Sequence, residues 1–164
     1  MQHTATWIVV AATGALLSCP AAHAAADCSA STTAVAFGTY DLLATTPDDS
    51  VGNVTVVCTY VSGGTSQVGF TVALSAGNAG NYAQRQLKSG TAVLGYNLFT
   101  DSARSQVWGN GGAGTTVASG SFTIGPGAGN RRREASYPVY GRVPALQDAP
   151  PGSYSDSIVV TLAF

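Results

Sequence analysis

Cysteine and histidine are the residues of this chain best suited to chemistry, and few of them are present. The 164 residues include three cysteines and two histidines. His3, His23 and Cys19 lie in an N-terminal stretch that has the features of an export signal. Without that stretch, Cys28 and Cys58 remain and no histidine does. Histidine is the commonest general base in catalysis, so we expect no triad-type or histidine-assisted chemistry.

Cys28 and Cys58 predict a disulfide, because two cysteines in an exported chain usually pair. In the chain-entropy model, closing a loop of about 30 residues stabilises the fold by roughly 3–4 kcal/mol. The alternative is two free thiols.

The N-terminus predicts a signal peptide. Residues 7–17 (WIVVAATGALL) carry no charge, and this run is shorter than the roughly 20 residues that span a bilayer. The triplets at 22–24 (AHA) and 24–26 (AAA) both match the A-x-A cleavage pattern. We expect a signal peptide over 1–26, cut after Ala24 or Ala26, and one domain over 27–164. A buried N-terminal helix and lipidation at Cys19 are the alternatives.

Acidic and basic residues offer no further chemistry. Asp48 and Asp49 follow Pro47 and are typical of a solvated turn rather than an acid pair. The run Arg131-Arg132-Arg133 favours a solvated loop, with contact to an acidic partner or an anionic polysaccharide as the alternative. The net charge of −1 does not favour nucleic acid, and zinc-type His/Cys clusters are missing from the sequence. We expect no enzyme, no cofactor, no metal and no small-molecule substrate.

Period-two patterns predict the elements that position these residues. Val54, Val56, Cys58 and Tyr60 share one face of a strand, so Cys58 should point inward. Pro138 predicts an edge strand or a bulge, and 77–90 and 125–134 are expected to be loops. About seven short strands favour an all-β two-sheet sandwich or a barrel. The expected strands are Thr32–Tyr40, Asn53–Tyr60, Gln67–Ser75, Val93–Thr100, one within Thr115–Ile124, Tyr137–Val143 and Tyr154–Phe164, with a brief apolar element at Val107-Trp108.

Short motifs spread along the chain resemble those of the spore coat protein U domain family, which includes pilin subunits of archaic, Csu-type chaperone–usher pili. Their order and spacing together carry the resemblance. They are 37–41 (FGTYD), 54–58 (VTVVC), Arg85, 94–101 (LGYNLFTD), 107–111 (VWGNG), 139–144 (VYGRVP), Gln147 and 151–156 (PGSYSD).

The resemblance implies an immunoglobulin-like β-sandwich that is incomplete by itself. In such families a periplasmic chaperone fills the missing-strand groove, and a neighbouring subunit's strand later replaces it. The implied partners are a periplasmic chaperone, an outer-membrane usher and other pilus or coat subunits, and the implied location is the cell surface, reached through the periplasm. The last strand would line the groove with Ile158, Val160, Leu162 and Phe164.

One departure from a shaft pilin concerns the N-terminus. A shaft subunit needs an N-terminal donor extension of roughly ten residues that alternate in polarity, whereas Cys28 almost directly follows the expected cleavage site. We therefore expect a tip, minor or coat subunit. The alternative function is a self-contained secreted β-sandwich that binds carbohydrate or another surface.

Overall fold

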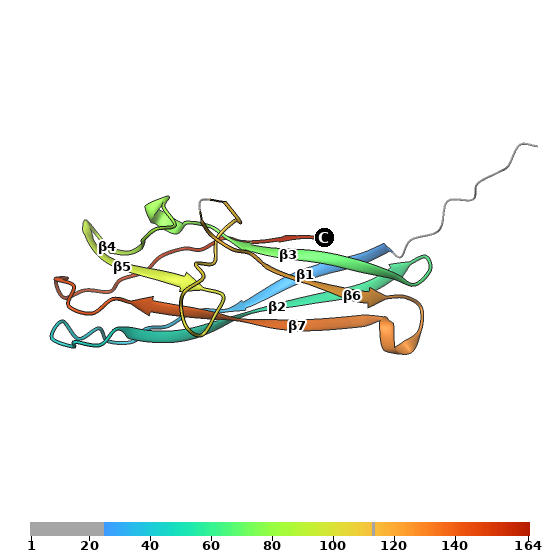
Figure 1. The fold of residues 1–164 in the computed structure, drawn as a ribbon, viewed down its shortest axis with the longest axis horizontal. Coiled ribbons are helices and arrows are strands. Elements are labelled where there is room, and N and C mark those ends of the chain that lie inside the picture. The colour runs from blue at the N-terminus through green and yellow to red at the C-terminus, as the bar shows by residue number, and fades with distance from the viewer. Residues whose placement is uncertain (1–24, 113) are drawn as a thin grey trace, which may run out of the picture.

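The computed structural model describes residues 25–112 and 114–164, which form an elongated two-layer β-sandwich (Figure 1). One sheet has the strand order β1-β2-β7-β5-β4, and the other has the order β6-β3-β8. All strand pairs are antiparallel. The strands are β1 (Ala25–Thr33), β2 (Asp48–Ser62), β3 (Ser66–Leu74), β4 (Arg85–Ser89), β5 (Ala92–Phe99), β6 (Ala118–Ile124), β7 (Arg132–Val143) and β8 (Val160–Ala163). The predicted all-β sandwich is confirmed.

Helical structure is minor in the described part of the chain. It consists of two 3-10 turns, η1 (Gly77–Ala79) and η2 (Ala128–Asn130). Over residues 25–112 and 114–164, no helix is long and apolar enough to cross a membrane. The expected signal peptide lies almost wholly outside the described residues, except for Ala25 and Ala26, which begin β1.

The core lies between the two sheets, where the period-two pattern turns apolar side chains inward. In β2, Val54, Val56 and Cys58 are buried, as predicted. Trp108 is also buried, and its indole Nε1 donates to the Val72 carbonyl at 2.9 Å. This hydrogen bond satisfies the N–H group of the indole, so burial of the ring leaves no unpaired polar atom in the core.

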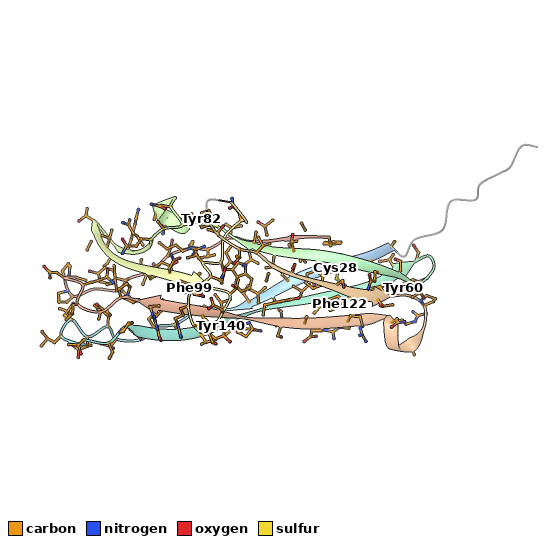
Figure 2. All side chains as sticks on the ribbon, viewed as in Figure 1. Cys28, Tyr60, Tyr82, Phe99, Phe122 and Tyr140 are labelled. Carbon is orange, nitrogen blue, oxygen red and sulfur yellow. A yellow bond between two sulfur atoms is a disulfide. The ribbon has the colours of Figure 1, made fainter. Side chains whose placement is uncertain are left out.

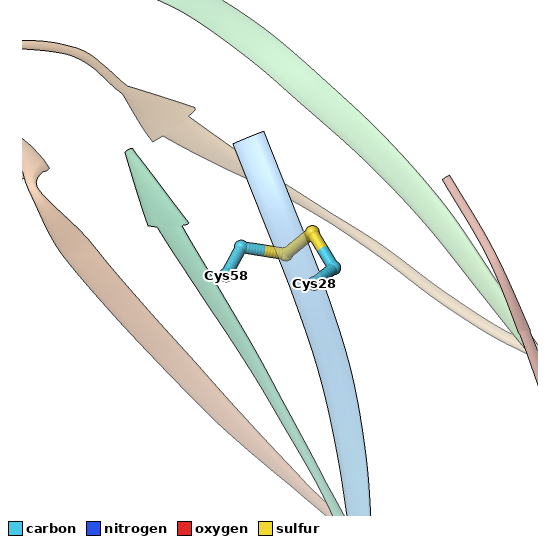
Figure 3. The surroundings of a disulfide bond; sticks show 2 residues. All are labelled: Cys28 and Cys58. Atoms are coloured by element: carbon cyan, nitrogen blue, oxygen red, sulfur yellow. A yellow bond between two sulfur atoms is a disulfide. The ribbon is translucent and has the colours of Figure 1, made fainter. Parts of the chain in front are cut away.

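The predicted disulfide joins Cys28 and Cys58 (Figure 3). The two residues face each other across the β1–β2 ladder, and both side chains are buried. The bond fastens the first strand to the second at the end where β1 begins.

The first strand differs from its prediction of Thr32–Tyr40. β1 ends at Thr33, and residues 34–40 leave the sheet. Val35 and Phe37 still face inward and pack on the core. Their alternation mimics a strand, but they lie across the inner face of the sheet instead of pairing at its edge.

Three further predictions about strands are corrected. Residues 85–89 form β4 and not a loop; its first inward side chain is the charged Arg85, which hid the strand from a hydrophobic pattern. The last strand is short, because 155–159 crosses between sheets: Ser155 bridges Lys88 of β4, whereas Val160 pairs with Leu74 of β3.

β7 is the third correction: it begins at Arg132 and lies between β2 and β5, not at an edge. β5 pairs with β7 only at Tyr140–Arg142, so at Pro138 the strand β7 has β2 as its single strand neighbour. Proline is tolerated there as it is in an edge strand. The early start of β7 also moves Arg132 and Arg133 out of the expected loop.

Candidate functional site

The two sides of the sandwich are sealed to different extents. On one side, Phe70 and Phe122 of the small sheet pack with tilted rings, 4.9 Å between centroids, and Tyr137 of β7 meets Phe70 edge-on at 6.1 Å. The other side is bounded by β1 and β8. In the described residues β1 pairs only with β2, and β8 pairs only with β3. Each therefore keeps one edge without a strand neighbour.

A cleft opens on the side of β1 and β8, and its smaller hollow is lined in part by Thr32 and Thr33 of β1 and Val160 of β8. The cleft has two hollows of about 200 Å³ and 670 Å³ that share Val35, Phe37, Leu87 and Asp156. The smaller hollow reaches the core between the sheets. Its floor comes from both sheets and consists of Val54, Leu74, Leu87, Tyr96, Leu98 and Val139.

The first wall of the cleft is residues 34–40. Gly141 of β7 allows this segment to lie close to the sheet, because a Cβ there would sit 2.6 Å from a Val35 methyl. Beyond it, the Tyr40 hydroxyl donates to the Pro144 carbonyl at 2.7 Å and accepts from the backbone amide of Gln147 at 2.9 Å. The side-chain amide of Gln147 in turn accepts from the Gly95 backbone amide and donates to the Gly95 carbonyl, both at 2.8 Å, as a neighbouring strand would. These bonds give the wall a fixed position.

The second wall is the C-terminal segment that crosses the two sheets. Ile158 and Val160 line the smaller hollow, and Leu162 packs half-buried on the core. Phe164, the fourth predicted groove residue, is 59% exposed and does not line either hollow. Three of the four predicted residues therefore continue the inner face, whereas Phe164 is exposed.

Asp156 lies on the same face of this wall and was not among the predicted residues. Its Oδ2 accepts from the Tyr96 hydroxyl at 2.7 Å, and its Oδ1 accepts from the Asn78 amide at 2.8 Å. Burial, followed by the hydrogen bond to Asp156, raises the pKa of Tyr96, so this phenol stays protonated and donates. A hydrophobic pattern overlooks Asp156 because it is charged, although its position two residues before Ile158 placed it on the inward face.

Arg85 is fully buried at the start of β4, the strand that also carries the cleft residue Leu87. Its guanidinium donates to the Ser75 carbonyl at 2.8 Å, the Trp108 carbonyl at 2.7 Å and Asn97 Oδ1 at 2.6 Å. It also faces the Tyr82 ring at 5.3 Å. Burial lowers the pKa of Arg85, but arginine stays charged in proteins. The sequence singled out Arg85 only through the family resemblance and indicated no role for it.

The charged residues that the sequence suggested for other chemistry lie elsewhere. Asp48 and Asp49 begin β2 instead of forming a solvated turn. Arg142 donates two hydrogen bonds to Asp49, at 2.7 and 2.8 Å, and thereby lowers the pKa of that carboxyl. Over the described ranges, no three His, Cys, Asp or Glu residues gather where they could hold a metal.

The arginine run lies at the end of the molecule near Tyr60, which Figure 2 labels beside Cys28 and Phe122. Arg131 faces the Tyr60 ring at 5.7 Å, and Arg132 pairs with Glu134 at 2.8 Å. Arg133 donates to the Gly129 carbonyl at 3.4 Å. All three side chains are exposed and engaged with their own chain, so they do not form part of the cleft.

Comparison with known proteins gives consistent results at the levels of family, sequence and structure. The Spore Coat Protein U domain matches residues 13–161. Protein U of Myxococcus xanthus is 30% identical over 135 residues, which cover 78% of this chain and 70% of that protein.

A solved structure is also similar: a chain of the CsuC–CsuE chaperone–tip adhesion subunit pre-assembly complex from archaic chaperone-usher Csu pili of Acinetobacter baumannii. The TM-score is 0.53 at 25% identity, with 85% of this chain covered. The chain spans 40% of the length of that structure's chain. Family and fold are those of structural subunits of a pilus or coat, and this chain belongs to the spore coat protein U domain family.

Proposed function

We propose that this protein is a structural subunit of a chaperone–usher pilus or a cell-surface coat and is exported to the cell surface. An extended strand from another polypeptide would complete its sandwich. The observation that carries the proposal is the cleft between β1 and β8, where both strands keep an unpaired edge over an apolar floor. Strand addition would satisfy these backbone groups and cover the exposed apolar surface.

The partners in this proposal are a periplasmic chaperone, then an usher and neighbouring subunits. Support for the chaperone comes from the similar structure, which is a chaperone–tip subunit complex. Passage through the periplasm agrees with the Cys28–Cys58 disulfide, since disulfides form in oxidising compartments. It would also require the signal peptide that the sequence predicts at 1–26. No catalytic step is part of this function.

A tip, minor or coat position is favoured over the repeating shaft position. β1 pairs with β2 from Ala25 onward, so the residues after the expected cleavage site already belong to the subunit's own sheet. Cleavage after Ala24 would keep β1 whole and leave no free N-terminal strand to donate. Such a subunit would accept a strand without passing one on.

The test is capture of the partner from the periplasm. The full chain carries an affinity tag inserted at Gly129, an exposed turn residue where an added Cβ would meet no atom within 4 Å. We expect a chaperone to co-purify with the wild type and with Val159→Asp, because Val159 is 64% exposed. Val160→Asp places a charge in the cleft and should abolish the capture.

Two results would contradict the proposal. One is equal capture by the Val159 and Val160 variants, because the partner would then bind elsewhere. The other is a stable monomer secreted without any partner, which would favour a self-contained surface-binding sandwich.

A further inference from the structure

Asp156 is the one charged residue among those that line the two hollows of the cleft. Both hollows include it, so it lies where the larger passes into the smaller. Apart from it, the smaller hollow is lined by apolar side chains and a few uncharged polar ones. A strand laid along the cleft therefore meets a carboxylate at one position and apolar surface beside it.

The spacing of the second wall fixes where that position falls. Residues 156, 158, 160 and 162 are half-buried, whereas 155, 157, 159, 161 and 163 are exposed. Asp156 thus belongs to a period-two inward row that begins with the half-buried Tyr154 and continues with Ile158, Val160 and Leu162. An added strand has the same period, so its inward residues meet this row one by one.

The carboxylate is held rigidly but is not saturated. It accepts hydrogen bonds from the Tyr96 hydroxyl and from the amides of Asn78 and Ser157. An ionised carboxylate has about four acceptor sites, so capacity for a further donor remains. Two of these bonds come from other segments of the chain, at Tyr96 and Asn78, and they prevent the side chain from turning out of the cleft when a strand arrives.

From this arrangement we infer that Asp156 determines the specificity of the cleft: the strand it accepts is a peptide with apolar side chains at alternate positions and a hydrogen-bond-donating side chain, hydroxyl or ammonium, opposite Asp156. An apolar residue there would remove water from the carboxylate and leave an acceptor unsatisfied. That penalty corresponds to about a tenfold to hundredfold loss of affinity. The inference rests on the proposed function and specifies its ligand.

The test uses fluorescein-labelled peptides of alternating valine and serine, with binding to the mature protein followed by anisotropy. The peptides differ at one inward position, which carries serine, lysine, valine or glutamate. Each is also made in reversed order, because the cleft leaves the direction of the strand open. We expect the serine and lysine peptides to bind at least tenfold more tightly than the valine peptide, and the glutamate peptide to bind most weakly.

Register and the carboxylate itself provide the controls. Moving the serine by two positions, opposite Ile158, should abolish its advantage. Asp156→Val should reverse the preference in favour of the valine peptide. Asp148→Asn removes an exposed carboxylate that lines neither hollow, so it should preserve the preference. If Asp156→Val does not fold, the peptide series on the wild type decides alone.

Equal binding of the valine and serine peptides, or an advantage of serine at every inward position, would overturn the role of Asp156 and leave strand acceptance intact. Binding by none of the peptides would instead count against strand acceptance, and this inference would fall with it.

Discussion

The two sides of the sandwich follow the same inward and outward alternation but reach different outcomes. On the β6–β7 side, Phe70 and Phe122 are 3% and 9% exposed, and Ile124 is fully buried. On the β1–β8 side, Ile158, Val160 and Leu162 are only half-buried beside an open cleft. One side finds its covering partner within the chain, and the other presents the same apolar surface without one. In the described residues the second seam therefore offers the surface that the proposed added strand would cover.

The largest effect is expected on the sealed side. Phe70→Ala should lower the free energy of unfolding by about 3–5 kcal/mol, because it removes a buried ring and leaves a cavity. Urea unfolding of the mature protein measures the change. The matched variant Phe164→Ala, at a residue 59% exposed, should change stability by less than about 0.5 kcal/mol. Similar losses of unfolding free energy at Phe70 and Phe164 would contradict the difference between a buried core residue and an exposed one.

The disulfide is expected to have the next largest effect, since it joins β1 to β2 beside the open seam. Replacing both Cys28 and Cys58 with alanine should lower the free energy of unfolding by about 3–4 kcal/mol through a less restricted unfolded chain. Urea unfolding with and without reductant should show a reductant effect in the wild type alone. Unchanged stability in the double variant would show that the β1–β2 ladder holds without the bond.

A change on the open side should depend on whether a partner is present. Ile158→Ala should lower the free energy of unfolding by roughly 1 kcal/mol in the chain alone, because the side chain is half-exposed there. With a strand added to the cleft the loss should rise to about 2–3 kcal/mol, as for a fully buried residue. Unfolding measured with and without a saturating cleft peptide tests this. An equal loss in both states would mean that the peptide does not cover Ile158.

The smallest expected effect concerns the outer face of the large sheet. The two hydrogen bonds from Arg142 lower the folded-state pKa of Asp49. Its stabilisation is therefore present above the unfolded pKa of about 3.9 and is lost as the pH falls through the lowered folded value.

Asp49→Asn should remove this acid-sensitive contribution, which is below about 1 kcal/mol for a pair this exposed. Unfolding from pH 7 to pH 2 measures it, with Asp148→Asn as the exposed control. An identical acid profile in the Asp49 variant and the wild type would rule the contribution out.

The sequence predicted what depends on local alternation. The inward face of β2 follows from it, because this strand packs on the core with a regular period. The disulfide was predicted separately, from the two cysteines that remain in an exported chain. β4 was missed because its buried residue is Arg85, whose burial depends on carbonyls of Ser75 and Trp108 far along the chain. The first strand was predicted too far along the chain, at Thr32–Tyr40 instead of Ala25–Thr33, and the last strand was predicted too long. In both cases, alternation at Val35, Phe37 and Ile158 reflects inward packing without strand pairing.

The candidate site was predictable only in part. The resemblance pointed to the C-terminal segment, but the opposite wall at 34–40 depends on contacts of Tyr40 and Gln147 that link residues about a hundred positions apart. The position of Asp156 on the inward row could be read from the sequence. Its role could not, because it depends on the hydrogen bonds from Tyr96 and Asn78, which lie on other segments.

Amide hydrogen exchange along β8 tests the open edge most directly. The Ser75 amide donates to the Val159 carbonyl, so antiparallel alternation turns the Thr161 and Ala163 amides toward β3 and those of Val160 and Leu162 toward the cleft. We predict fast exchange at Val160 and Leu162 in the protein alone and strong protection once a strand is added, with Thr161 and Ala163 protected in both states. Protection of Val160 and Leu162 in the protein alone would contradict the account, because the seam would already be closed.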